Sequence, residues 1–341
     1  KITILDGAMG TVLQQKGLPA GGQPELLNLT DPGLIEDVHR AYIRAGSRVV
    51  YTNTFGANRL KLERTGHATE EIISAAVGAA KAAAAGTDAA VALDVGPLGA
   101  LLEPLGNLSF QRAYELFREM TEAGAAAGAD LIVIETITDL YEAKAALLAA
   151  RESTALPVFV TMSFEESGRT FTGCTAASMA RTLEGLGADA IGLNCSLGPD
   201  KLAPLIREIS ENTTLPVIAK PNAGLPDPLS GRYDVGPAEF AAAMLACLDA
   251  GASIIGGCCG TSPEYIRELA AAAEGRRPSP RHYRGGAFVC TPSVPLPLDG
   301  VRVIGERINP TGKKRFQQAL LEDDLDYILD GAIHQEDAGA A

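Results

Sequence analysis

The sequence predicts a (β/α)8 barrel, an α/β fold in which eight parallel strands form a closed ring inside a layer of helices. Eight short apolar runs recur in the first 275 residues, and they lack the polar–apolar alternation of a sheet with one solvated face. Such runs are typical of parallel strands that are covered on both sides. Helical patterns separate them, and eight βα units in 275 residues match the size of this barrel.

The expected elements follow one another with a recurring junction. A glycine that ends a helix precedes a short polar turn and an apolar run at Gly46, Gly128, Gly187 and Gly251. The expected strands are residues 2–5, 48–52, 91–95, 131–135, 158–163, 190–194, 217–220 and 253–256. The expected helices include residues 75–85, 113–127, 139–151 and 263–273. A doubly wound open sheet is the alternative, but no Gly-x-Gly-x-x-Gly follows the first strand.

Composition narrows the class of protein. Apolar residues make up 46% of the 341 residues, which is enough for a large core. The net charge of −13 argues against a nucleic-acid partner, because phosphate binding needs clustered lysine and arginine. The sequence has no run of 18 apolar residues and no visible signal peptide, so no membrane span is expected. Six cysteines in a chain of this length do not make a secreted disulfide framework, and a cytoplasmic location is expected.

The sequence divides into three regions. Residues 1–275 are expected to form the barrel, and the proline-rich residues 276–300 are expected to be a linker. A new strand is expected at residues 301–304, followed by a helical pattern within residues 314–335. One βα unit cannot bury a core of its own, so residues 301–341 are interpreted as the truncated start of a second domain.

Chemically active residues stand at the ends of the expected strands, where the active sites of such barrels lie. In chain order they are Asp6, Asn53, Asp94, Glu135, Cys195, Asn222 and the pair Cys258-Cys259, and none of the four histidines is among them. Glu135 ends a wholly apolar strand, where an unpaired carboxylate would be costly, so it is expected to face a substrate. Asp6 fits either ligand binding or a turn or helix cap, and Asn53 and Asp94 remain open between a structural role and a functional one.

Cys195, Cys258 and Cys259 predict a metal site. They follow the sixth and eighth strands, so their thiolates can converge on one ion, with one coordination position left open as in catalytic zinc sites. Adjacent cysteines can share an ion only if the chain turns there, which Gly256, Gly257 and Gly260 permit. A zinc held by three thiolates is suited to binding a fourth thiolate and keeping it ionised, so the predicted reaction is alkyl transfer to a substrate thiol. The other cysteines, Cys174, Cys247 and Cys290, are interpreted as small buried apolar residues.

Together the strand-end motifs resemble a known family. The matching segments are Leu5-Asp6-Gly7-Ala8-Met9-Gly10-Thr11, Thr52-Asn53-Thr54-Phe55-Gly56-Ala57, Asp94-Val95-Gly96-Pro97, Glu135-Thr136, Gly192-Leu193-Asn194-Cys195-Ser196, Lys220-Pro221-Asn222-Ala223-Gly224 and Gly256-Gly257-Cys258-Cys259-Gly260-Thr261. The chain resembles the homocysteine S-methyltransferase domain found at the N-terminus of cobalamin-dependent methionine synthases, over essentially all of residues 1–275. Cys174 departs from the pattern, since a small polar residue is expected in its loop, and it could approach the barrel mouth as an oxidation partner.

The resemblance implies roles for individual residues. Cys195, Cys258 and Cys259 would hold zinc, with the homocysteine sulfur as a further ligand. Asp6 and Glu135 would hold the substrate ammonium, and the backbone amides near Gly7 and Ala8 would lie near its carboxylate. Asn222 would occupy the remaining zinc position before substrate arrives.

The resemblance leaves the methyl donor open. Residues 303–312, Val-Ile-Gly-Glu-Arg-Ile-Asn-Pro-Thr-Gly, resemble the start of the pterin-binding barrel of the same enzymes, which favours methylcobalamin presented by a separate domain. The expected partners are therefore homocysteine and the cobalamin-binding and methyltetrahydrofolate-binding domains of a longer protein. One alternative is a cobalamin-independent methyltransferase that uses S-methylmethionine or betaine. Another is a non-catalytic docking module with a structural zinc, which would need a fourth Cys or His at a strand end.

Overall fold

The computed structural model describes residues 1–19, 21–227 and 233–340. They fall into two compact units, residues 1–284 with 290–295, and residues 285–289 with 296–341. Each unit is described by itself.

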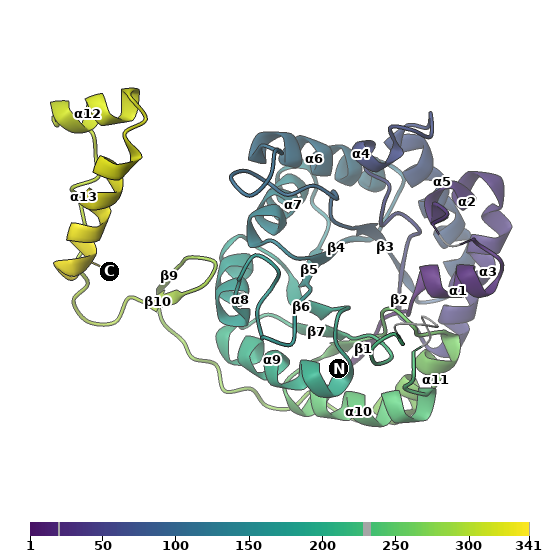
Figure 1. Cartoon of the computed structure of the whole chain (residues 1–341). Coiled ribbons are helices and arrows are strands. Elements are labelled where there is room, and N and C mark those ends of the chain that lie inside the picture. The colour runs from purple at the N-terminus through teal and green to yellow at the C-terminus, as the bar shows by residue number, and fades with distance from the viewer. Residues whose placement is uncertain (20, 228–232, 341) are drawn as a thin grey trace. The chain divides into compact units, whose positions relative to one another are not determined.

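The first unit is a (β/α)8 barrel (Figure 1). Its strands are β1 (Thr3–Ile4), β2 (Val49–Tyr51), β3 (Ala90–Val95), β4 (Leu131–Ile137), β5 (Val158–Met162), β6 (Ala190–Asn194), β7 (Val217–Lys220) and β8 (Ile254–Ile255). Neighbouring strands pair in parallel in the order β1-β8-β7-β6-β5-β4-β3-β2, and a parallel bridge between Leu5 and Val49 joins the two ends of the sheet. The predicted barrel is therefore confirmed, and the open sheet is excluded.

Helices surround the strands. They are α1 (Met9–Gln15), η1 (Pro24–Leu26), α2 (Leu27–Thr30), α3 (Pro32–Ala45), α4 (Arg59–Leu62), α5 (Thr69–Ala84), α6 (Phe110–Ala126), α7 (Leu140–Ser153), α8 (Ala176–Gly185), α9 (Pro199–Asn212), α10 (Pro237–Asp249) and α11 (Pro263–Ala273). The junction glycines Gly46, Gly128, Gly187 and Gly251 all have left-handed φ values, between 91° and 112°. Because glycine adopts this conformation without a Cβ clash, each can end its helix and turn the chain into the next strand.

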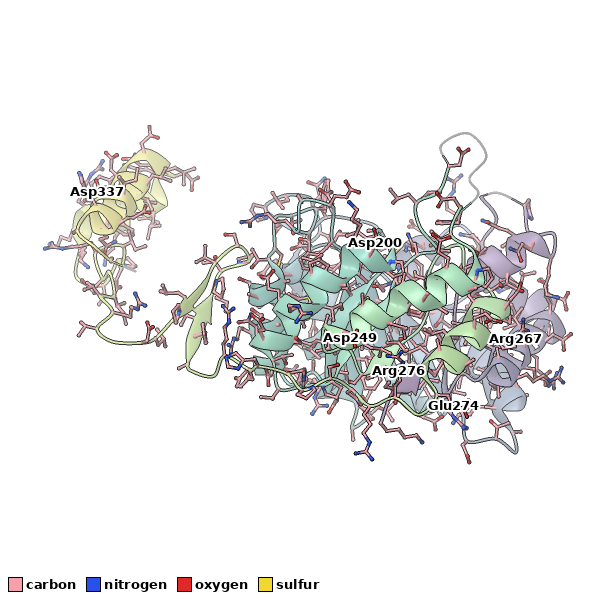
Figure 2. The ribbon with its side chains drawn as sticks, turned by 90° about the horizontal axis from the view of Figure 1, so that it is seen from below. Asp200, Asp249, Arg267, Glu274, Arg276 and Asp337 are labelled. Carbon is pink, nitrogen blue, oxygen red and sulfur yellow. The ribbon has the colours of Figure 1, made fainter. Side chains whose placement is uncertain are left out.

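Two layers of apolar side chains fill the barrel unit. The inner layer contains Leu5, Val49, Tyr51, Ala92, Leu131, Val133, Ala190, Ile218 and Ile254. A larger cluster lies between the strands and the helices and includes Leu93 of β3 with Leu116 and Phe117 of α6. The outer faces of α9, α10 and α11 carry exposed charged side chains such as Asp200, Asp249 and Arg267 (Figure 2). The inside of the barrel is thus a packed core, which leaves the C-terminal ends of the strands to form a site.

The C-terminal region differs from its prediction in the position of its strands. Residues 301–304 form no strand, and Val301 is 94% exposed. A strand needs a hydrogen-bonded neighbour, and β9 (Phe288–Cys290) and β10 (Pro295–Pro297) pair with each other instead. The helical pattern forms two helices, α12 (Lys314–Leu321) and α13 (Leu325–Asp337), which pack through Phe316 and Tyr327 with ring centroids 6.2 Å apart. No helix in the described parts of the chain is long and apolar enough to cross a membrane.

Candidate metal and substrate site

A cavity of about 280 Å³ lies at the C-terminal ends of the barrel strands. Nine of the ten residues predicted for the site line it: Asp6, Gly7, Ala8, Asn53, Asp94, Glu135, Cys195, Cys258 and Cys259. The tenth, Asn222, is buried and is not among the lining residues. The structure therefore places groups from β1, β2, β3, β4, β6 and β8 around one space, as the strand-end argument expects.

The three cysteines converge within this cavity. The Sγ atoms of Cys195, Cys258 and Cys259 all lie within 4.8 Å of one another. Cys195 Sγ and Cys259 Sγ are 3.8 Å apart. A tetrahedral zinc with Zn–S bonds of about 2.3 Å separates its sulfur ligands by about 3.8 Å, so the spacing fits one ion. Among the described residues, no fourth Cys or His joins this group.

Local backbone geometry aims the thiols. Cys195 and Ser196 both have left-handed φ values, 62° and 53°, which turn the chain at the end of β6. After β8, a Cβ on Gly256 would lie 2.7 Å from the Leu5 side chain, so the chain passes β1 too closely for any larger residue. The Thr261 hydroxyl then donates to the Cys258 carbonyl at 2.7 Å and fixes the turn that carries both cysteines.

Hydrogen bonds among the sulfurs perturb their acidity. Hydrogen bonds from the Cys195 and Cys258 thiols lower the pKa of Cys259, whereas the hydrogen bonds of Cys195 with Cys258 and Cys259 raise the pKa of Cys195. The Tyr233 hydroxyl also bonds to Cys259 and helps to lower that pKa. In the metal-free group these hydrogen bonds therefore favour ionisation of Cys259 over Cys195 and Cys258.

Three carboxylates from β1, β3 and β4 face the same cavity. Asp6 Oδ2 accepts a hydrogen bond from the Tyr51 amide at 2.7 Å, so Asp6 is not a helix cap, and α1 begins only at Met9. Burial raises the pKa of Asp6 and of Glu135 to about 7, and it raises the pKa of Asp94 well above its usual range. Asp6 Oδ1, Asp94 Oδ1 and Glu135 Oε2 are buried and have no hydrogen-bond partner in the described structure. These oxygens can accept hydrogen bonds from a cationic ligand.

Lys220 ends β7 and lines the same cavity, although its sequence position alone predicts no role for it. Its Nζ lies 3.7 Å from Asp6 Oδ1, 3.6 Å from Glu135 Oε2 and 4.4 Å from the centroid of the Tyr51 ring. Burial by itself would lower the pKa of Lys220, but attraction to Glu135 and Asp6 outweighs it and raises the pKa. The lysine is thus held as a charged partner of both carboxylates.

Two of the amide groups predicted for the site, the Asn53 side chain and the Ala8 backbone, form hydrogen bonds with the surrounding structure. Asn53 Nδ2 donates to the Pro24 carbonyl at 2.7 Å and to Asn28 Oδ1 at 3.1 Å. The Ala8 amide donates to Thr261 Oγ1 at 3.1 Å, so that donor is already engaged. Asn222 follows Pro221, whose carbonyl accepts from the Cys258 amide at 2.7 Å. The Asn222 Oδ1 atom is buried without a hydrogen-bond partner among the described residues.

The remaining cysteines lie outside this cavity. Cys174 and Cys247 are fully buried, and Cys290 is half-buried. Burial raises the pKa of the Cys174 thiol to about 12, and its Sγ donates to the Thr175 carbonyl at 3.4 Å. Cys174 therefore does not reach the barrel mouth as an oxidation partner, because its loop folds it into the core.

The fold and the site define a class: a (β/α)8 barrel with an open group of three thiols beside a carboxylate-lined cavity. Residues 3–273 match the family model for homocysteine S-methyltransferase. The chain belongs to the homocysteine S-methyltransferase family.

Among curated relatives, the methionine synthases of Mycobacterium tuberculosis (strain ATCC 25618 / H37Rv) and Mycobacterium leprae (strain TN) are each 34% identical over the whole chain. The chain spans about 30% of the length of these two relatives. The homocysteine methyltransferase MmuM of Escherichia coli is a structural neighbour. Its metallated form has a TM-score of 0.67 at 25% identity, covering 79% of this chain and 96% of that one. Its apo form has a TM-score of 0.63 at 27% identity, covering 80% and 95%.

Proposed function

We propose that this chain carries out zinc-dependent methyl transfer to the thiol of homocysteine, giving methionine. The observation that carries the proposal is the meeting of three thiols and three carboxylates in one cavity, where no other Cys or His of the described residues joins the three thiols. An amino-acid thiol presents a sulfur to the first group and an ammonium to the second. Both halves of such a substrate therefore find their chemical complement within one space.

Cys195, Cys258 and Cys259 would hold the zinc. When bound, zinc keeps the substrate thiol ionised at neutral pH and leaves it nucleophilic. Asp6 and Glu135 would bind the substrate ammonium through Asp6 Oδ1 and Glu135 Oε2, buried oxygens that accept no hydrogen bond from the described residues and pair with Lys220 Nζ only at 3.6–3.7 Å. A charge-assisted hydrogen bond to a carboxylate is about twice as strong as a neutral one, which favours these atoms as the anchor. Asp94 Oδ1 is a third acceptor at the same cavity.

Methylcobalamin, presented by a domain outside this chain, is the proposed methyl donor. The matched methionine synthases are about three times longer than the matched region, which leaves room for such a domain and for one that binds methyltetrahydrofolate. A small donor such as S-methylmethionine or betaine is the second candidate. The Escherichia coli homocysteine methyltransferase supports this candidate, because this chain covers 95–96% of that protein. Little of that protein therefore remains to form a cofactor-carrying domain.

The non-catalytic docking module is disfavoured by the donor set. A structural zinc site is closed by four protein ligands, whereas the described residues offer three cysteines that open onto a cavity. The metallated form of the Escherichia coli homocysteine methyltransferase supports a metal in the family.

The test combines metal analysis with methyl transfer. We expect Cys258→Ser to lose bound zinc and methyl transfer to homocysteine, while its circular dichroism stays that of a folded barrel. Cys247→Ser is the matched control, because Cys247 is fully buried in α10 with its Sγ bonded to the Pro199 carbonyl. That variant should keep both zinc and activity.

The donor is decided in the same assay by supplying methylcobalamin, S-methylmethionine or betaine with homocysteine. Turnover with methylcobalamin alone supports the proposal, and turnover with a small donor in the absence of cobalamin selects the second candidate. Retention of zinc and of full activity in Cys258→Ser would overturn the metal assignment.

A further inference from the structure

Asn194 links the two halves of the cavity. It is the last residue of β6, directly before Cys195, and its side chain is 1% exposed. Asn194 Oδ1 accepts from the Thr136 amide at 2.8 Å and from the Thr161 hydroxyl at 2.8 Å. Asn194 Nδ2 donates to Thr136 Oγ1 at 2.7 Å and contacts Cys258 Sγ at 3.8 Å. One amide thus joins β4, β5 and the cysteine turn after β8.

The orientation of this amide follows from its partners. The Thr136 backbone N–H can only donate, so the atom facing it must be the carbonyl oxygen of Asn194. The NH₂ group then necessarily points toward Thr136 Oγ1 and Cys258 Sγ. A sulfur within 4 Å of an N–H group is an acceptor, and hydrogen bonds from neighbouring groups tune how strongly a ligand atom holds its metal.

Thr136, at the β4 end of this link, has a backbone conformation that needs support from its surroundings. Thr136 has φ of 62°, and the register of β4 against β5 shifts between Ile134 and Ile137. A left-handed conformation is disfavoured for a β-branched residue and costs about 1–3 kcal/mol unless its surroundings enforce it. The two hydrogen bonds between Thr136 and Asn194 supply that enforcement. Glu135 lies inside the same bulge, so the bulge sets where its carboxylate points.

From this geometry we infer that Asn194 is a positioning residue that couples the substrate-binding carboxylate of Glu135 to the thiolate of Cys258. Its carbonyl oxygen and NH₂ group hold the Thr136 bulge that directs Glu135. The NH₂ group also bonds to Cys258 Sγ and draws charge from it. The inference rests on the proposed function, because it assigns Asn194 to the same amino-acid and metal site.

Two substitutions separate the two arms of this link. Asn194→Asp keeps an oxygen for the Thr136 amide and the Thr161 hydroxyl, but it has no N–H to offer Cys258 Sγ or Thr136 Oγ1. Thr136→Gly removes the hydroxyl arm but keeps the backbone N–H that donates to Asn194 Oδ1. Glycine also gives the backbone access to many other conformations, so the bulge is held less tightly. Asn58→Asp is the control for burying a carboxylate: Asn58 is fully buried, it caps α4 through Oδ1, and it does not line the cavity.

The readouts are the thiolate-to-cobalt charge-transfer band of the Co²⁺-loaded protein and the homocysteine dissociation constant. We expect Asn194→Asp to shift the band to lower energy, because a sulfur that loses an N–H donor holds its electrons less tightly. We expect Thr136→Gly to leave the band in place and to weaken homocysteine binding about tenfold, equivalent to about 1.4 kcal/mol. Asn194→Ala should change both readouts, and Asn58→Asp should change neither.

The outcomes distinguish this inference from the function on which it rests. If the unmodified protein binds no Co²⁺, or if homocysteine does not perturb its band, the proposed function fails. If the unmodified protein responds but the Asn194→Asp band stays in place, Asn194 does not act on the sulfur and the inference is overturned. The inference is equally overturned if Thr136→Gly binds homocysteine as tightly as the unmodified protein. If Asn194→Ala does not fold, the Asn194→Asp and Thr136→Gly pair still decides the question.

Discussion

Replacing Lys220 with methionine tests the charge arrangement at the floor of the cavity. The lysine is 3% exposed and lies 3.6–3.7 Å from carboxylate oxygens of Glu135 and Asp6. Removing one partner of a buried ion pair typically costs about 3–5 kcal/mol, because the other charge is left uncompensated. Methionine keeps the length and the apolar stem of lysine, so the loss is chiefly electrostatic.

The size of this loss depends on pH. Burial raises the pKa of Asp6 and Glu135 to about 7 in the folded protein, above the ordinary values of 3.8 and 4.5. For a folded-state pKa that is raised, the stability contributed by the group is complete below its unfolded pKa and is lost as pH rises through the folded pKa. Without Lys220 both folded pKa values rise further, because the lysine lowers them. The variant therefore loses more stability than the unmodified protein above pH 7.

The assay is urea unfolding of the metal-free, reduced protein between pH 5.5 and 8.5, which removes metal binding from the comparison. We expect Lys220→Met to be less stable by about 3 kcal/mol at pH 8.5, with the difference closing toward about pH 6 as the carboxylates bind protons. Lys201→Met, at an exposed position of α9, should be neutral at every pH. A loss of the same size at pH 5.5 and pH 8.5 would refute the electrostatic account.

Two further predictions concern buried titratable groups away from the cavity. Glu142 accepts from the Leu98 amide at 2.8 Å, and burial raises its pKa to about 7 from 4.5, so ionising it costs stability as pH rises through that window. Glu142→Gln should increase the unfolding free energy at pH 8 by about 2 kcal/mol and leave it unchanged at pH 4, and an equal gain at both would contradict this origin. His39 is fully buried, neither ring nitrogen has a hydrogen-bond partner in the described structure, and burial lowers its pKa from 6.5 to about 4. Stability is then lost as pH falls from 6.5 to 4, by up to about 3 kcal/mol, and His39→Leu should flatten this part of a urea-unfolding pH profile.

The barrel could be predicted from the sequence because its signals are local. Each strand is an unbroken apolar run, and glycines such as Gly46 and Gly251 mark the helix ends through a conformation that other residues avoid. The same logic failed at residues 301–304, where a strand-like run has no neighbour to pair with. Strand propensity is local, but strand formation depends on a partner that the run itself does not specify.

The sequence predicted some residues of the candidate site but not others. Strand-end position was enough to bring Cys195, Glu135 and Asp6 to one cavity, since parallel strands end at the same edge. Lys220 was not predicted, because a lysine side chain at a strand end is expected to be solvated unless carboxylate partners are known to lie nearby. The bulge at Thr136 left no trace in the sequence, because a β-branched residue there predicts a regular strand. Its conformation is imposed by Asn194, 58 positions away along the chain.

Charge balance gives a reason for the cavity to select an amino-acid thiol over a simple thiol. With Asp6, Asp94 and Glu135 ionised, Lys220 compensates only one of three negative charges, and their raised pKa values record the cost of holding the rest. A bound ammonium would add the second positive charge and would donate to Asp6 Oδ1, Asp94 Oδ1 and Glu135 Oε2, which accept no hydrogen bond from the described residues. Lys220 Nζ lies 3.6–3.7 Å from two of these oxygens, beyond hydrogen-bond distance. A thiol without an ammonium would leave that cost in place. On the proposed function, the substrate therefore stabilises the ionised form of the carboxylates that bind it. The affinity for homocysteine is then expected to increase with the number of these carboxylates that are ionised.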